Sequence, residues 1–249
     1  MSSHLIAGRN PVMEALKAGA SIEKIMILFG VKGNVIEKIR ATAREKKIPC
    51  VETDKQKFRD FAGEADAQGV VALLGTKKYS EIEDLLAIAR ELRQKPFLLI
   101  LDEIEDPQNL GAMIRTAECA GVHGVIIPKH HAASVNRTVS KASAGATEHM
   151  AIAKVTNLVS TMEQLKEAGL WMIGTDMDGG KSYDQIDYSI PLALIIGSEG
   201  SGMRRLVKEK CDFLIRIPMF GKIQSLNASV AAALVMYEVV RNRKAAQRV

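Results

Sequence analysis

The sequence predicts an α/β protein built from two units, and three observations support this. Short apolar runs alternate with amphipathic segments along the chain, which is typical of layered α/β structure. Runs in the second half such as FLLILD and PLALIIG are continuously apolar, as expected of a parallel sheet with helices on both faces. The polar stretch TKKY interrupts the alternation. We therefore predict domains over 1–76 and 96–249, joined by a linker helix over 77–95.

In the first domain, the apolar periodicity predicts helices after Pro11, over 34–47 and from Asp54 onward. Asn10 is a candidate N-cap of the first helix and Gly19 its end. Strands are expected over 25–29, 48–52 and 70–74. These elements form a small α/β unit.

The linker helix is expected over 80–94, with Ser80 and Glu83 in capping-box positions. In the second domain, apolar runs predict strands over 97–102, 122–127, 170–176, 191–197 and 213–217. Amphipathic segments predict helices over 108–120, 135–145, 156–168, 203–210 and 225–243. Because the carboxyl ends of parallel strands lie along one edge of a sheet, a ligand site is expected there.

Composition narrows the class of protein. The chain has 249 residues, 47% of them hydrophobic, which is enough for a sizeable core, and a net charge of +5 that is compatible with a polyanionic partner. Its three cysteines are far apart and His130 and His131 are adjacent, so neither a disulfide framework nor a metal site is expected. The N-terminal stretch has no apolar core of signal-peptide length, and no apolar run has the length of a membrane helix, so we expect a soluble, cytoplasmic protein.

Three connectors carry unusual polar residues. In the first, NLGAMIRTAEC, Asn109 and Arg115 are placed to project from the N-terminal end of a helix towards the edge of the sheet. A buried arginine among apolar neighbours needs a phosphate or carboxylate partner, which would make Arg115 a candidate site residue. The alternative interpretation is a surface arginine on an amphipathic helix.

The second connector, IIGSEGSGM, is a strand that enters a glycine-rich turn, where Gly197 lets the backbone approach a ligand and Glu199 is placed to accept hydrogen bonds. A tight turn without a ligand is the alternative. The turn lacks the GxGxxG of a dinucleotide site. The segment GTDMDGGKSY has Thr175 where a phosphate loop needs glycine, which argues against an NTPase.

The third connector is IPMFGKIQSLNAS. Ser225 is a candidate cap of the last helix. Capping by Ser225 does not explain Asn227, a polar residue that opens an otherwise apolar helix, so this helix start is a second candidate binding site.

Together and in this order, the three blocks resemble the SpoU branch of the SPOUT methyltransferases. The resemblance implies S-adenosylmethionine as methyl donor, the ribose 2′-hydroxyl of RNA as acceptor, a C-terminal trefoil knot, and a homodimer that combines residues of two subunits. The stretches HLIAGRNPVMEALKAG and IEKIMI are similar to the small, ribosomal-protein-like RNA-binding domain of the rRNA guanosine-2′-O-methyltransferases. The expected substrate is therefore guanosine in 23S rRNA.

The resemblance also implies residue roles. Arg115 assists removal of the hydroxyl proton, or stabilises the developing alkoxide electrostatically. Asn109 orients the arginine or the ribose, Glu199 positions the target nucleotide, and Asn227 completes the cleft. The residues expected to hold the donor are Gly197, Ile217, Met219, Ser225 and Leu226.

Alternative functions are a tRNA ribose 2′-O-methyltransferase, a non-catalytic rRNA-binding factor, and a nucleotide-dependent oxidoreductase. The matching residues Asn109, Arg115, Glu199 and Asn227 argue against the non-catalytic factor, and calorimetry with S-adenosylmethionine would distinguish the two. The missing GxGxxG argues against the oxidoreductase.

Overall fold

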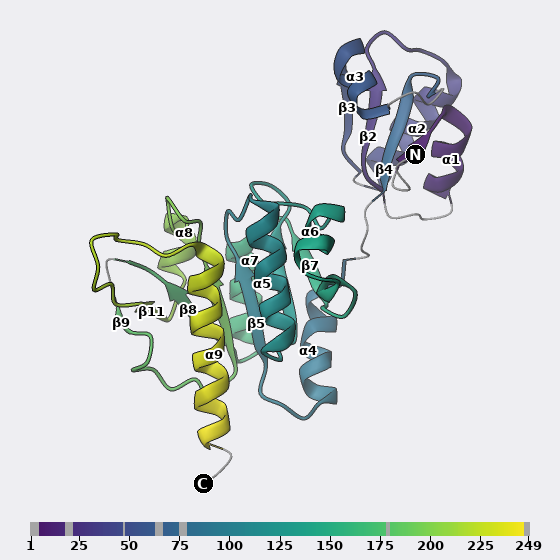
Figure 1. The fold of residues 1–249 in the computed structure, drawn as a ribbon. Helices are drawn as coiled ribbons and strands as arrows, with labels where there is room; N and C mark the ends of the chain where they lie inside the picture. Colours follow the sequence, from purple (N-terminus) through teal and green to yellow (C-terminus); the bar gives the residue numbers. More distant parts are fainter. Residues whose placement is uncertain are drawn as a thin grey trace. The chain divides into compact units, whose positions relative to one another are not determined.

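The computed structural model describes residues 5–17, 22–46, 48–62, 67–74, 79–177 and 180–246. The chain divides into two compact units, one over 1–78 and the other over 79–249 (Figure 1). The linker over 77–95 stays a prediction.

The first unit is built on a small mixed sheet. Its described strands lie in the order β1-β4-β2-β3, where β2 and β3 run parallel and the other two pairings are antiparallel. The strands are β1 (Leu5–Ala7), β2 (Ile22–Leu28), β3 (Cys50–Thr53) and β4 (Val70–Leu74). The sequence analysis missed β1, because three residues at a sheet edge are too few to show a period.

Helices cover both faces of this small sheet. They are α1 (Arg9–Lys17), α2 (Asn34–Glu45) and α3 (Lys55–Ala62). The first two pack their apolar residues on one face, and α3 inserts Phe58 against Met26 on the other. The expectation that Asn10 caps α1 is wrong, since the helix already begins at Arg9 and Asn10 lies inside it. The expected helix end at Gly19 lies outside the described residues.

The second unit is built on a larger sheet whose described strands all pair in parallel. Their order is β7-β6-β5-β10-β8-β11-β9, with β10 between β5 and β8. The strands are β5 (Phe97–Leu101), β6 (Gly124–Pro128), β7 (Ile152–Val155), β8 (Trp171–Thr175), β9 (Lys181–Ser182), β10 (Leu192–Ile196) and β11 (Phe213–Arg216). The predicted parallel sheet is confirmed.

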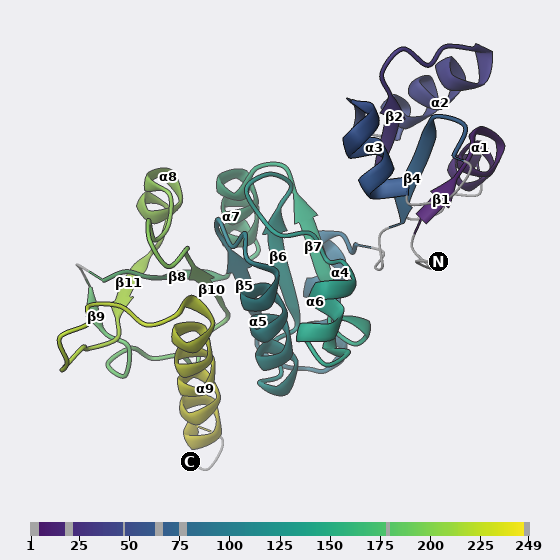
Figure 2. The same cartoon turned by 45° about the horizontal axis from the view of Figure 1, so that its top comes forward.

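Both faces of the larger sheet are covered, as predicted, and β5 shows why its sequence is continuously apolar. Leu99 and Leu101 face a core formed with α5, α6 and α9, whereas Leu98 and Ile100 face a core formed with α4, α7 and α8. The helices are α4 (Ile82–Glu91), α5 (Pro107–Cys119), α6 (Arg137–Ala142), α7 (Leu158–Glu167), α8 (Arg205–Glu209) and α9 (Ala228–Ala246). A short 3₁₀ turn spans Ala146–Glu148. Helices α5 and α9 lie side by side (Figures 1 and 2).

Two details differ from the sequence predictions. The short strands β7 and β9 were missed, since neither carries a long apolar run. The capping box of α4 lies one residue later than predicted: the Glu81 backbone N–H donates to the Asp84 carboxylate at 2.9 Å. Ser80 instead forms an isolated β-bridge with Ala153, and its backbone N–H donates to the Ile152 carbonyl.

Among the residues described, no helix is both long and apolar enough to cross a bilayer. The trefoil knot, which rests on the family resemblance, stays a prediction.

Candidate functional site

The connector between β5 and α5 brings Asn109 to the carboxyl edge of the larger sheet. Asp106 caps α5, since its carboxylate accepts hydrogen bonds from the backbone N–H groups of Gln108 (3.1 Å) and Asn109 (3.3 Å). Pro107 follows at the first helical position, where its missing N–H costs nothing. Asn109 therefore lies in the first turn of a helix whose start is fixed by the Asp106 cap and by Pro107.

The loop after β10 is a tight turn closed on itself. Ser198 and Gly202 exchange backbone hydrogen bonds of 3.0 Å in both directions. A Cβ atom at Gly197 would come within 2.2 Å of the Gly202 carbonyl carbon, so only glycine fits there. The turn carries Glu199, which is exposed, near its tip.

A buried ion pair ties this loop to the β5–α5 connector. Asp102 follows β5 with its side chain fully buried, and it accepts hydrogen bonds from the Arg204 backbone N–H and the Arg204 Nε, both at 2.8 Å. Arg204 Nη2 lies 2.7 Å from the same carboxylate. Because Arg204 directly follows the glycine-rich turn, the pair holds two connectors that are about 100 residues apart in sequence. This pair was not predicted from the sequence, since neither residue stands out in its own segment.

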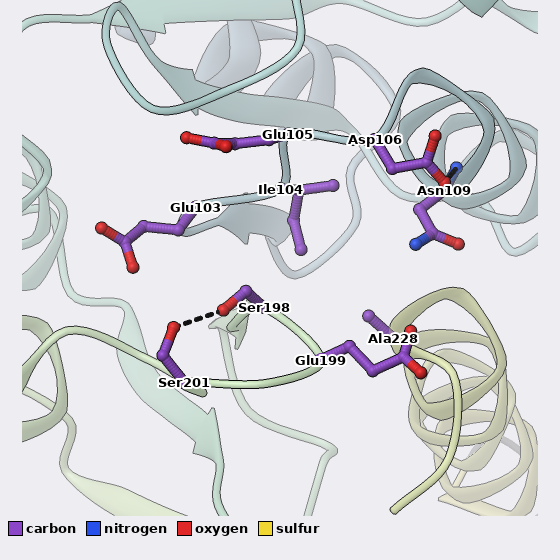
Figure 3. Close-up of a pocket in the computed structure, with 9 residues that line it drawn as sticks. All are labelled: Glu103, Ile104, Glu105, Asp106, Asn109, Ser198, Glu199, Ser201 and Ala228. Carbon is purple, nitrogen blue, oxygen red and sulfur yellow. Dashed lines mark hydrogen bonds between the residues drawn. The ribbon is translucent and has the colours of Figure 1, made fainter.

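Asn227 is hydrogen-bonded to two of the other predicted residues. Its side-chain Nδ2 donates to Asn109 Oδ1 at 3.0 Å and to Glu199 Oε2 at 3.3 Å. Its Oδ1 accepts a hydrogen bond from the Ser229 backbone N–H at 2.9 Å, so Asn227 is the cap of α9. The prediction that Ser225 caps this helix is wrong, because α9 begins at Ala228. One amide thus fixes the helix start and links the two other connectors (Figure 3 shows Asn109 and Glu199).

A large cavity opens beside this cluster, at the carboxyl ends of β8, β10 and β11. Its volume is about 840 Å³, within the range of small-molecule sites. The five residues predicted to hold a methyl donor all line it: Gly197, Ile217, Met219, Ser225 and Leu226. The structure therefore gathers all five around one cavity.

The same cavity contains residues that the sequence analysis missed. Thr175 ends β8 and Asp176 follows it; both line the wall, and Asp176 lies 2.6 Å from Lys208 Nζ. Their signal was present, since LWMIGTD turns from apolar to polar at a strand end as the three chosen connectors do.

A smaller, carboxylate-rich pocket of about 430 Å³ lies on the other side of the glycine-rich turn. Glu103, Glu105 and Asp106 line it together with Asn109 (Figure 3). Both cavities have Ser198, Glu199, Ser201 and Ala228 in their walls. Glu199 and the start of α9 therefore stand where the two spaces meet.

Arg115 does not join this cluster. It is the ninth residue of α5, exposed, and lines neither cavity. The expectation that it projects from the N-terminal end of the helix is wrong. Six helical residues place Asn109 and Arg115 about 120° apart around the axis and about 9 Å apart along it. Within one copy of the chain, the arginine is separate from the other three predicted residues.

The cysteine nearest the site is not suited to act as a nucleophile. Burial raises the pKa of the Cys211 thiol to about 12, and its Sγ–H points to the Val207 carbonyl. A thiol with such a pKa is almost wholly protonated at neutral pH. Cys211 is therefore a structural thiol rather than a reactive group of the site.

Parallel strands with a ligand cavity at their carboxyl ends define a class of α/β enzymes, and sequence comparison identifies the family within it. The profile of the SpoU rRNA Methylase family matches residues 96–237, and that of the "RNA 2'-O ribose methyltransferase substrate binding" domain matches residues 5–80. This chain belongs to the SpoU methylase family, whose members are also called TrmH-type RNA ribose 2′-O-methyltransferases.

Relatives match over nearly the full length. The Bacillus subtilis protein YacO, assigned to the TrmH family of tRNA/rRNA methyltransferases, is 46% identical, and the match covers 96% of this chain and 95% of YacO. A Staphylococcus aureus protein with the same family assignment is 45% identical, with 98% of both chains covered.

Solved structures show the same fold. The AdoMet-bound rRNA methyltransferase of Sinorhizobium meliloti superposes with a TM-score of 0.60 at 26% identity, covering 96% of this chain and 87% of that one. The A. aeolicus TrmH/SpoU tRNA modifying enzyme superposes with a TM-score of 0.58 at 28% identity, covering 66% of this chain and 86% of that one.

Proposed function

We propose that this enzyme transfers a methyl group from S-adenosylmethionine to the ribose 2′-hydroxyl of guanosine in 23S rRNA. The observation that carries the proposal is the link from Asn227 to Asn109 and Glu199, at the edge of a cavity lined by the five predicted donor-binding residues. This places a polar cluster directly beside a space of suitable size for the donor.

The cavity walls suit S-adenosylmethionine. Ile217, Met219 and Leu226 offer apolar surface for the adenine and the methionine chain, and the glycine-rich turn brings backbone groups close. Bound there, S-adenosylmethionine would supply a methyl group on a positively charged sulfur. The AdoMet complex of the S. meliloti relative supports this assignment.

The protein's own contribution is to place the acceptor. Glu199 presents a carboxylate on the wall shared by the two cavities, Asn109 an amide on the wall of the smaller one, and Asn227 is hydrogen-bonded to both. Holding the ribose hydroxyl in line with the donor supplies several kcal/mol of the barrier. Arg115 has two possible roles. As a neutral guanidine it would accept the hydroxyl proton itself; as a protonated guanidinium it would stabilise the developing alkoxide while the proton passes to solvent. The second role is easier, because a guanidinium stays protonated.

Because Arg115 lies outside the cluster, we propose that the active unit is a homodimer in which the arginine of one copy completes the site of the other. Helix α9 carries an exposed apolar stripe at helical spacing, Val230, Leu234 and Tyr237, which favours self-association.

The choice of rRNA over tRNA is supported by domain content. The rRNA methyltransferase from S. meliloti matches 96% of this chain, whereas the A. aeolicus tRNA modifying enzyme matches 66%. The alternatives remain a tRNA substrate and a non-catalytic rRNA-binding factor. The identity of the base as guanosine, and a cytoplasmic location, rest on the resemblance and composition described above.

The test is to map 2′-O-methyl groups in rRNA and tRNA from cells with and without the gene. Loss of one guanosine methylation in 23S rRNA, restored by the wild-type gene, is the expected result. Loss confined to a tRNA would assign the alternative substrate. An unchanged methylation map, together with no S-adenosylmethionine binding by calorimetry, would identify a non-catalytic factor.

A further inference from the structure

The basic character of this protein is concentrated in its first unit. Residues 1–78 contain 14 Lys and Arg against nine Asp and Glu, whereas residues 79–249 contain 20 of each. The whole net charge of +5 therefore belongs to the unit that matches the substrate-binding domain. A polyanion is attracted there more strongly than to the neutral catalytic unit.

Within the described part of this unit, one large aromatic side chain stands out. Phe29 directly follows β2, and 75% of it is exposed. Its backbone is nonetheless held, since the Phe29 N–H donates to the Thr53 carbonyl at 2.8 Å and the Leu28 N–H donates to Gly69 at 2.9 Å. Gly30 follows with a φ of +81°, so the chain turns sharply after the ring. The ring is presented to solvent on a fixed support.

Phe29 also forms one wall of a cavity. The cavity, of about 480 Å³, lies at the carboxyl ends of the parallel strands β2 and β3, the usual place for ligands on such strands. Leu28, Thr53 and Lys55 line it with Phe29. The space thus combines an aromatic face, an apolar floor and a cation.

Two carboxylates in the same wall are already engaged. Glu52 pairs with Arg40, and Asp54 accepts the Lys57 backbone N–H at 2.9 Å as the cap of α3. That hydrogen bond also lowers the pKa of Asp54. Lys55 is the first residue of α3, and the same helix presents Lys57 and Arg59 to solvent.

We propose that Phe29 and its cavity form a stacking site for an unpaired nucleobase of the RNA substrate, with Lys55 and its neighbours on α3 contacting the adjoining phosphates. An exposed aromatic ring with flanking cations is the usual device for binding single-stranded RNA. The inference rests on the proposed function for the nature of the substrate. It adds a recognition site outside the methyl-transfer cluster.

The test uses the full-length protein and a fluorescent 12-nucleotide single-stranded RNA of mixed sequence. The same sequence as a 12-base-pair duplex is the comparison probe. Phe29→Ala is expected to weaken single-strand binding about 5- to 100-fold and to leave duplex binding within about twofold. Phe29→Trp should retain single-strand affinity, because the indole restores the stacking surface.

Phe61→Ala is the matched control, because Phe61 is a second exposed aromatic residue of this unit, 43% exposed, that does not line the cavity. The Phe61→Ala protein should bind the single-stranded RNA with the affinity of the wild type. Single-strand binding by Phe29→Ala within twofold of wild type would overturn the proposal, as would an equal loss in Phe61→Ala. An equal loss for both probes would show a non-specific effect and also overturn it. Circular dichroism of each variant controls for folding.

The two proposals fail separately. If wild-type protein methylates rRNA while Phe29→Ala binds single strands normally, only the stacking site is refuted. If binding depends on Phe29 but the wild type transfers no methyl group to RNA, only the proposed reaction is refuted.

Discussion

The two units share a construction but differ in charge and in what they expose. Each is a sheet covered by helices on both faces. The first unit has a net charge of +5, an exposed Phe29 and lysines on α3, whereas the second is neutral overall and lines the smaller of its two cavities with four carboxylates. The difference indicates that attraction of the RNA and methyl transfer belong to different units, because the unit with the excess of cations attracts a polyanion more strongly.

The largest expected effect concerns Arg115, whose proposed role in methyl transfer follows from the family resemblance. Arg115→Ala should lower methyl transfer about 10²- to 10³-fold, since it removes transition-state stabilisation, and retain S-adenosylmethionine binding. Single-turnover assays and calorimetry measure the two quantities. Undiminished turnover would refute the assignment.

A mixing experiment then decides which copy supplies the arginine. Arg115→Ala and Asn227→Asp proteins, unfolded and refolded together, should regain about a quarter of wild-type activity if a dimer site takes Arg115 from the partner. No recovery in a mixed dimer would place the arginine in its own chain's site.

The second effect concerns Asn227. In Asn227→Asp the carboxylate still accepts the Ser229 N–H and caps α9, but it no longer donates to Asn109 and Glu199. Turnover should fall about 10- to 100-fold, while the thermal midpoint stays close to wild type. Asn227→Ala loses the cap as well, and should lower the midpoint too. A large drop in the midpoint of Asn227→Asp would show that the link is mainly structural.

The third effect compares the units directly through salt dependence. Lys55→Gln with Lys57→Gln should reduce the slope of log affinity for single-stranded RNA against log salt by about 1.4, if each lysine neutralises one phosphate. Arg90→Gln with Lys244→Gln removes two exposed charges of the second unit as the matched control. Equal slopes in the two variants would contradict the assignment of RNA attraction to the first unit.

The smallest effect is a pH dependence confined to the second unit. His123 is buried, its Nδ1 accepting the Phe97 N–H at 2.9 Å and its Nε2 contacting Gln94. Burial, with a smaller contribution from Arg243, lowers the pKa of His123 below 6.5. Because the unfolded chain then binds the proton more readily, stability is complete above about pH 6.5 and is lost as the pH falls from there towards the lower folded pKa.

Unfolding followed by the fluorescence of Trp171 tests this, because Trp171 is the chain's single tryptophan and lies in β8 of the second unit. The free energy of unfolding should decrease from pH 7 to pH 5 by less than about 1.4 kcal/mol per unit of pH, the limit for one proton. The decrease should be smaller in His123→Gln. An identical pH profile in the variant would exclude the histidine as the cause.

Much of the second unit follows from local sequence. Five-residue apolar strands such as β5 and β10 are buried on both faces. Their uninterrupted apolar pattern is typical of buried strands in a parallel sheet, so the sequence predicts them well. The short strands β1, β7 and β9 were not predicted, because pairing with neighbouring strands, rather than their own composition, makes them strands.

Local sequence patterns were enough to predict the class of fold, the family and the three polar connectors after strands of the larger sheet. The hydrogen bond from Asn227 to Asn109 across 118 residues, the separate position of Arg115 and the exposure of Phe29 became visible only in the folded chain. The reason is physical: periodicity and capping act over a few neighbouring residues, whereas hydrogen-bond partners and burial depend on how distant segments pack.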